Sequence, residues 1–196
     1  MTPARQAPPQ PAPRRRLPPE ERKRQLVAIG LQELATRPIH ALSVDRVAEI
    51  AGISRGLLFR YFPTKQDYYA AVVGAAARRL LRAAVPDPGD DDPLRGVVRA
   101  FVSFIDRHGR NYQMLFHGAG FGYDPQIREI HENVKNTMAA RILDATGTEP
   151  STATTMKVCG WWSMVESVAI DRTTEPSVTV DDVVDFALRT LPVILT

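Results

Sequence analysis

Three observations in the amino-acid sequence predict an all-α protein. Apolar residues recur at the three- and four-residue spacing of helices over most of the 196 residues, and the alternation typical of strands is scarce. Ser, Thr or Asp stands before several of these segments, and Gly or Pro follows them, as at helix ends. We therefore expect a three-helix domain followed by a larger domain of roughly six helices. Within the larger domain, Gly109 is expected to end one helix, and a short helical piece at residues 112–117 is expected to follow it.

The expected domain boundaries follow changes in composition. Residues 1–18 are rich in Pro, Gln, Ala and Arg, and such a segment buries too little apolar surface to fold by itself. Its last arginines, Arg14 to Arg16, are interpreted either as an arm that reaches DNA or as part of a solvated extension. Residues 19–66 are expected to form the first domain and residues 67–196 the second.

The first domain is organised around two short helices joined by a tight turn. Ser43 is placed to cap the first of them, and Gly52 to end it in the left-handed conformation. Ser54 is placed to cap the second, and Thr64 opens a long fourth helix with a capping box. The second short helix is basic and aromatic, so the pair predicts a helix-turn-helix that enters a DNA major groove.

Residues 51–65 read A-G-I-S-R-G-L-L-F-R-Y-F-P-T-K. This order resembles the DNA-binding domain of TetR-type transcriptional repressors, whose members carry A-G-V-S-x-G-x-L-Y-x-Y-F-x-x-K there. The resemblance extends from Arg24 to about Tyr69. It implies an all-helical, dimeric regulator that binds a palindromic operator in double-stranded DNA.

Two positions depart from the family pattern. The family usually has Thr where Leu57 stands and Tyr where Phe59 stands, and both usual residues can form hydrogen bonds with DNA. Leu and Phe offer only apolar contacts, which leaves Arg55 and Arg60 as the expected readers of bases. The predicted DNA-binding residues are Ser43, Arg46, Ser54, Arg55, Gly56, Leu57, Phe59, Arg60, Tyr61 and Lys65.

The charge distribution agrees with this interpretation. Through residue 70 the chain has 12 Lys and Arg against 6 Asp and Glu, whereas the remainder has 13 against 16. A basic first third suits contact with phosphates. The remainder is mildly acidic, so we do not expect it to contact phosphates.

Other classes of protein have little support in the sequence. The single Cys159 excludes an internal disulfide and a cysteine-based metal site, and we expect no metal and no cofactor. No apolar run is long enough to cross a bilayer and no secretory signal is present, so we expect a cytoplasmic protein. Catalysis by His108 or His117 with Glu166, or by Ser163 or Cys159, is the weakest alternative, because nothing fixes the geometry of these groups.

The last two predicted helices are residues 151–171 and 180–195. Both are apolar around most of their circumference, which predicts burial on most sides. The resemblance implies that the pair packs against the same pair of a second copy as a four-helix bundle. We expect a homodimer with Leu191 in that bundle.

Aromatic and polar-tipped residues gather between these helices and the long fourth helix. Each of them is interpreted either as part of an ordinary core or as part of a pocket that orients a mostly apolar ligand. The resemblance implies the pocket, since repressors of this family usually release DNA when a small molecule enters the second domain. A DNA-bound dimer without a ligand, or with a protein partner, is the main alternative. The candidate ligand-binding residues are Phe101, Phe104, His108, Tyr112, Phe116, His117, Phe121, Tyr123, Trp161, Trp162, Val165 and Glu166, the last of which lies either in the pocket or at the dimer interface.

Overall fold

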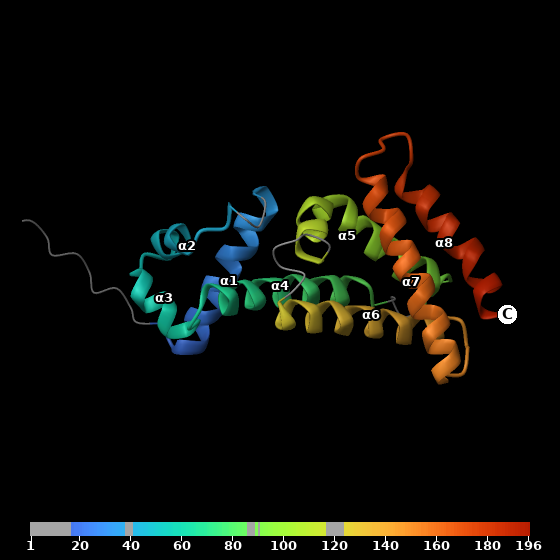
Figure 1. Ribbon diagram of the computed structural model, residues 1–196, viewed down its shortest axis with the longest axis horizontal. Helices are drawn as coiled ribbons and strands as arrows, with labels where there is room; N and C mark the ends of the chain where they lie inside the picture. The colour runs from blue at the N-terminus through green and yellow to red at the C-terminus, as the bar shows by residue number, and fades with distance from the viewer. Residues whose placement is uncertain (1–16, 38–40, 86–88, 90, 117–123) are drawn as a thin grey trace, which may run out of the picture.

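A computed structural model describes residues 17–37, 41–85, 89, 91–116 and 124–196, apart from the side chains at 110 and 114–116. Within these residues the chain is all-helical, as predicted, and contains no strand (Figure 1). The helices are α1 (Pro19–Thr36), α2 (Val44–Ala51), α3 (Arg55–Tyr61), α4 (Lys65–Ala83), α5 (Pro93–Phe116), α6 (Pro125–Ala145), α7 (Thr152–Arg172) and α8 (Val180–Leu195). The arginines of the tail, Arg14 to Arg16, lie outside the described residues.

The molecule is elongated, with α1 to α3 at one end and α7 and α8 at the other (Figure 1). Helices α4 and α6 run side by side along its length, and α5 lies between the two ends. Two apolar clusters fill the interior. One joins α1 to α3 with the first half of α4, and the other joins the second half of α4 with α5 to α8.

Helix α4 belongs to both clusters. Tyr68 and Val72 are fully buried with α1 to α3, while Leu80 is buried with α5 to α8. The first turn of α6 also reaches the first cluster, because Ile127 is buried there. A boundary at residues 66 and 67 therefore stays a prediction, since one continuous helix spans both cores.

The helix ends lie close to the predicted ones. Asp124 accepts hydrogen bonds from the backbone at the start of α6, and Gly147 follows that helix with a φ of 63°. Ser151 and Thr179 cap α7 and α8 through capping boxes. These signals are local, so the sequence specifies them without knowledge of the tertiary structure.

The predicted helix break at Gly109 is wrong. Helix α5 continues through this position to Phe116, so the predicted short helix at residues 112–117 is the end of α5. Gly109 is buried, and a Cβ atom there would lie 2.6 Å from the Cγ2 atom of Thr173. Glycine thus allows α5 to approach the end of α7, and this packing outweighs its cost of about 1 kcal/mol within a helix.

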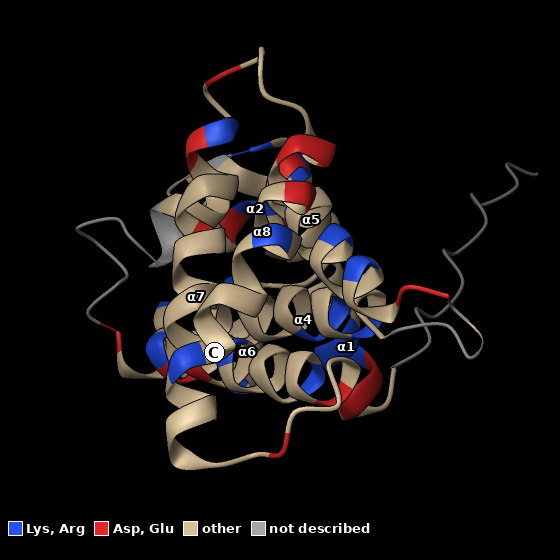
Figure 2. Cartoon of the chain, turned by 90° about the vertical axis from the view of Figure 1, so that its right-hand side faces the viewer, with Lys and Arg blue, Asp and Glu red and all other residues tan. Residues whose placement is uncertain are grey.

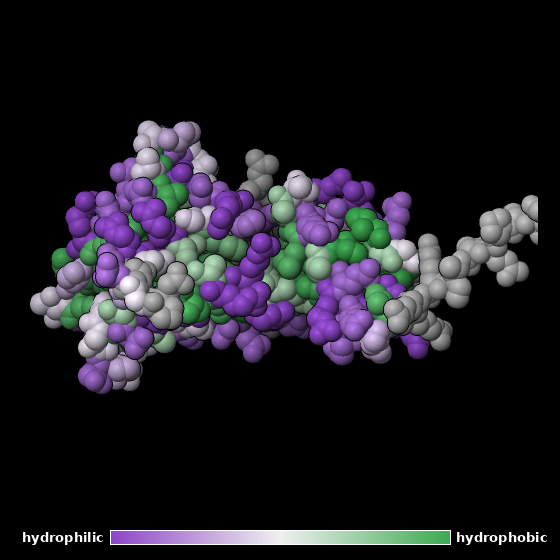
Figure 3. All heavy atoms as spheres, turned by 180° about the vertical axis from the view of Figure 1, so that it is seen from behind, coloured by the Kyte–Doolittle hydropathy of each residue, from purple (hydrophilic) through white to green (hydrophobic). Residues whose placement is uncertain are grey.

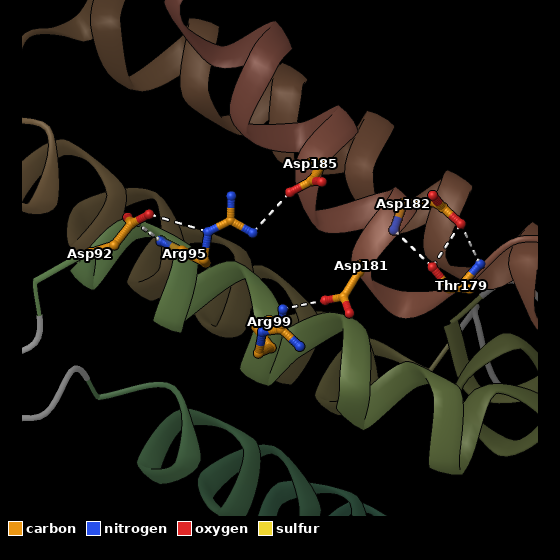
Figure 4. Close-up of polar contacts among 7 residues, drawn as sticks. All are labelled: Asp92, Arg95, Arg99, Thr179, Asp181, Asp182 and Asp185. Atoms are coloured by element: carbon orange, nitrogen blue, oxygen red, sulfur yellow. Dashed lines mark hydrogen bonds and ion pairs between the residues drawn. The ribbon is translucent and has the colours of Figure 1, made fainter.

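Ion pairs connect the start of α5 to the start of α8 (Figure 4). Asp92 accepts a hydrogen bond from the backbone nitrogen of Arg95, whose guanidinium lies 2.8 Å from Asp185. The next turn pairs Arg99 with Asp181. These side chains are half exposed, so each pair contributes at most about 1 kcal/mol, and their effect is to fix the orientation of α8 on α5.

Among the described residues, no helix combines the length and the apolar character that crossing a bilayer requires. The described part of the chain also contains no cluster of three His, Cys, Asp or Glu residues placed to hold a metal ion.

Candidate DNA-binding surface and ligand cavity

The turn between α2 and α3 has the geometry that its sequence predicts. Gly52 adopts φ 64° and ψ 37°, the left-handed conformation that ends a helix at little cost for glycine. The Ser54 hydroxyl accepts a hydrogen bond of 3.2 Å from the backbone nitrogen of Leu57 and so starts α3. The Ser43 hydroxyl has the same function for α2, at 3.5 Å from the backbone nitrogen of Arg46.

The side chains of α3 divide into a buried side and a solvent side. Leu58 is completely buried in the first cluster, and Phe62 follows it there. Arg55, Gly56 and Arg60 are exposed. Three further residues that the sequence places at the DNA are only partly exposed, namely Leu57, Phe59 and Tyr61.

The predicted cations differ in how they are held. Arg46 lies 2.7 Å from the carboxylate of Glu33 on α1. Arg55 lies 3.2 Å from Asp45 on α2, and its guanidinium carbon is 5.4 Å from the centre of the Phe59 ring. The side chains of Arg46 and Arg55 are 44% and 60% exposed, so these pairs are weak and can exchange for phosphate contacts.

Arg60 and Lys65 are less constrained. Arg60 is exposed and forms no ion pair with any residue that the structure describes. The Nζ atom of Lys65, in the first turn of α4, lies 5.0 Å from the centre of the Tyr69 ring. Two cations therefore remain available at the solvent side of the helix-turn-helix.

Two tyrosines attach α4 to this unit. The Tyr68 hydroxyl donates a hydrogen bond of 2.9 Å to the carbonyl oxygen of Leu26 in α1, and burial raises the pKa of Tyr68 well above its usual value. Tyr69 donates to the carbonyl oxygen of Leu42, just before α2. Helices α1 to α3 therefore move together with the start of α4.

A cavity of about 100 Å³ lies where the two apolar clusters meet. Its wall is mostly apolar, and four different helices contribute to it. The lining residues are Leu31, Leu34 and Ala35 from α1; Val73, Ala76, Ala77, Arg79 and Leu80 from α4; Phe104, His108, Asn111 and Tyr112 from α5; and His131 and Val134 from α6.

One wall of the cavity carries a buried polar cluster. The Tyr112 hydroxyl donates a hydrogen bond to the carboxylate of Glu166 on α7, and the Nε2 atom of His131 lies 2.7 Å from the same carboxylate. Burial, followed by the charge of Glu166, raises the pKa of Tyr112 well above its usual value, so its hydroxyl remains a donor. Glu166 is 3% exposed and lies inside the chain next to the cavity wall.

Comparison with known proteins fits this geometry. Residues 26–72 match the family model described as bacterial regulatory proteins, tetR family. A TetR-family transcriptional regulator from Streptomyces coelicolor has a similar structure, with a TM-score of 0.77 and 26% identity over 89% of this chain and 80% of that one. Residues 26–72 of this chain are thus a TetR-family domain.

The relatives of this chain include both an activator and a repressor of transcription. The chain is 31% identical to the transcriptional activator FasR of Mycolicibacterium smegmatis over 116 residues, 57% of this chain and 52% of FasR. It is 25% identical to a transcriptional repressor of Streptomyces coelicolor over 125 residues, 62% of this chain and 64% of the repressor. The chain thus spans about half the length of FasR and less than two thirds of the repressor. The matched family is one of regulatory proteins and not of enzymes.

The structure divides the predicted ligand-binding residues into three groups. Phe104, His108 and Tyr112 line the cavity. Four others are buried in the second core away from the lining, namely Phe101, Trp161, Trp162 and Val165. The side chain of Phe116 and residues His117, Phe121 and Tyr123 lie outside the described part of the chain.

The cavity walls from α1 and α4, and His131 from α6, were absent from the sequence prediction. Alanines and leucines on a helix give no signal of a cavity, because the same pattern predicts an ordinary core. Asn111 is also not among the predicted ligand-binding residues, although its side chain joins α5 to α1.

The predicted position of Leu191 in a dimer interface is wrong. Leu191 is 1% exposed and belongs to the second core of its own chain. The outward residues of the same turn are Val193, which is 75% exposed, and Ile194. The run of apolar residues at the end of α8 does not reveal which of them face the core.

Proposed function

We propose that this protein is a DNA-binding transcriptional repressor that leaves its operator when a small, mostly apolar molecule occupies the cavity. One observation carries the proposal. The cavity wall combines α1, which belongs to the helix-turn-helix unit, with α5 and α6, which do not. A molecule in this position contacts both parts at once, so its binding depends on their relative orientation.

The DNA is bound, in this proposal, by α3 in the major groove. Arg55 and Arg60 contact base edges, and Arg46 and Lys65 contact phosphates. Leu57 and Phe59 are partly buried, and their exposed apolar atoms contact the DNA, for example a thymine methyl group. The two α3 helices of a symmetric dimer reach two half-sites about one helical turn apart.

The dimer forms, in this proposal, through the outer faces of α7 and α8. This end of the molecule shows few charged residues when it faces the viewer (Figure 2). Met156 on α7 and Val193 on α8 are large apolar residues exposed by 69% and 75%. Elsewhere, as seen from behind, hydrophobic patches alternate with hydrophilic residues along the molecule (Figure 3).

Release follows from a shift between two states of the dimer. Tyr68 and Tyr69 hold α1 to α3 on the start of α4, so a tilt of α4 changes the distance between the two α3 helices. A ligand that binds the released state better by about 3 kcal/mol lowers operator affinity roughly a hundredfold.

The experiment is a selection of bound fragments from the source genome, followed by titration of the purified complex with a metabolite library. We expect a palindromic site, with at least one guanine per half-site that becomes tolerant of change in Arg55→Ala or Arg60→Ala. Arg82→Ala, an exposed arginine of α4 far from α3, is the matched control and keeps the preference. Failure of the wild type to select any sequence would contradict DNA recognition by α3.

The titration decides between this mechanism and a dimer that has no small-molecule ligand. The cavity mechanism is supported if at least one metabolite releases the protein from its operator and Ala76→Leu, which fills the cavity, abolishes this release. A complex that no metabolite releases supports the alternative. Because relatives include an activator and a repressor, a promoter fusion with and without the protein decides the sign of regulation.

A further inference from the structure

Two hollows meet at His108 and Asn111 on α5. One is the apolar cavity described above, and the other is a more open hollow of about 400 Å³ beside it. They share Leu34 and Ala35 of α1 as well as His108 and Asn111, so the same four residues border both. The second hollow is more polar, and Arg37, Asp106, Arg107 and Thr173 contribute to its wall.

The charges around this junction are unbalanced. Two nearby carboxylates have cationic partners, because Asp106 pairs with Arg172 and Glu33 pairs with Arg46. The buried carboxylate of Glu166 instead accepts a hydrogen bond from Tyr112 and lies 2.7 Å from the Nε2 atom of His131. Arg79, at the apolar cavity, and Arg107, at the polar hollow, form no ion pair with any residue that the structure describes.

Both arginines act on the same imidazole. His108 is half-buried, and burial lowers its pKa, with further lowering by the charges of Arg107 and then Arg79. The junction is thus a positively charged site at the end of an apolar cavity. Such an arrangement stabilises a negative charge attached to an apolar body.

We propose that the effector is an amphipathic anion, with its apolar body in the cavity and its anionic head beside His108, between Arg79 and Arg107. This inference rests on the proposed function, because it names the class of ligand for the same cavity. The shared chemistry is a single anionic group, such as a carboxylate or a phosphate, on an unbranched or aromatic apolar body.

The size of the cavity connects this ligand to release. An engineered cavity of about 150 Å³ in another protein holds one benzene molecule, and the present cavity measures about 100 Å³. A longer body needs additional space, and α1 is the wall that belongs to the helix-turn-helix unit. The ligand therefore separates α1 from α5 and breaks the hydrogen bonds from Asn111 to the end of α1.

The test compares octanoate, 1-octanol and octylammonium by titration calorimetry on the full chain. These probes share their apolar body and differ in charge. We expect octanoate to bind at least tenfold more tightly than octanol, and octylammonium to bind most weakly. In Arg79→Gln/Arg107→Gln the advantage of octanoate over octanol disappears, whereas Arg82→Gln retains it. Equal affinity of octanoate and octanol for the wild type overturns the proposal.

Two additions locate the ligand and identify its head group. Ala76→Leu fills one wall of the cavity, so it weakens octanoate and octanol alike, while circular dichroism verifies its fold. Unchanged octanoate binding in a folded Ala76→Leu variant overturns the assigned position. Octyl phosphate added in parallel shows whether a phosphate or a carboxylate head binds more tightly.

The outcomes separate this inference from the proposed function. Octanoate that binds at the cavity but leaves the operator complex intact supports the ligand class and contradicts the release mechanism. A neutral metabolite that releases DNA from the wild type, with no contribution from Arg79 and Arg107, contradicts the ligand class and supports the release mechanism.

Discussion

The side-chain amide of Asn111 on α5 donates a hydrogen bond of 2.7 Å to the carbonyl oxygen of Leu34 near the end of α1. A second hydrogen bond, of 3.0 Å, reaches the carbonyl oxygen of Arg37 just after that helix. The last carbonyl groups of a helix lack partners within it, so an amide from another helix can satisfy them. Asn111 thus links α5 directly to the helix-turn-helix unit.

Replacing Asn111 by Ala should weaken this link. We expect the free energy of unfolding to fall by about 1–2 kcal/mol, because two hydrogen bonds are lost. If the contact favours the DNA-bound state, operator affinity also falls, and the ratio between ligand-free and ligand-bound affinity shrinks. Urea unfolding and operator binding measure the two effects. The control is Asn133→Ala, an exposed position on α6, and equal behaviour of the two variants would remove Asn111 from the coupling.

Gly30→Ala should disturb the packing of α1 on α4. A Cβ atom at this position would lie 2.5 Å from the Tyr68 hydroxyl and 2.6 Å from the Cγ2 atom of Val72. The helices must then move apart, which costs about 1–3 kcal/mol of stability. Gly56→Ala is the matched control, because nothing lies within 4 Å of its Cβ position. We expect Gly56→Ala to be neutral or stabilising in urea unfolding, and a Gly30→Ala variant as stable as wild type would contradict the tight contact.

The helix ends and the helix-turn-helix were predictable because their signals are local. Gly52, Ser54 and Thr64 specify a turn and two helix starts from the identities of a few neighbours. The course of α5 through Gly109 was not predictable in this way. Its determinant is Thr173, which is distant in the sequence and reaches Gly109 only in the folded chain.

The cavity shows the same limit. His108 and Tyr112 are recognisable in the sequence because each carries a polar group on an apolar helical stripe, and both line the cavity. The leucines of α1 belong to the other domain in any division based on sequence, so nothing local assigns them to the same cavity. Likewise, the pattern of α8 does not show that Leu191 is buried while Val193 is exposed.

Val193→Glu tests the proposed dimer without disturbing the core. Val193 is 75% exposed in the single chain, so a carboxylate there costs the monomer little. In the proposed dimer the same carboxylate is buried without a partner, which costs several kcal/mol. We expect a folded monomer by light scattering, with operator affinity lowered by at least tenfold. Leu191→Glu, which places the charge in the core, should instead reduce stability itself. A Val193→Glu variant that remains dimeric would place the interface elsewhere.

The final prediction concerns the pH dependence of anion binding at His108. The charged and titratable groups that line the two hollows together with His108 are Arg79 of α4, Arg37 just after α1, His131 of α6, and Asp106, Arg107 and Tyr112 of its own helix. In the ligand-free protein its pKa lies below 6.5, first because of burial and then because of Arg107 and Arg79. Because the pKa is lowered, folding favours the neutral imidazole of His108. The contribution of this residue to the free energy of unfolding is therefore fully present above pH 6.5 and is lost as the pH falls.

An anionic head beside the imidazole reverses this bias, because an opposite charge raises the pKa of a histidine. Binding of octanoate then takes up a proton wherever the pH lies between the free and bound pKa values. We expect the affinity for octanoate to increase, by up to about tenfold, as the pH falls from 8 to 6, since the carboxylate itself stays ionised in this range. Octanol should show no such dependence, and His108→Gln should abolish that of octanoate. Calorimetry in two buffers of different ionisation enthalpy detects the proton directly, and the absence of proton uptake at pH 6 in wild type would place the anionic head away from His108.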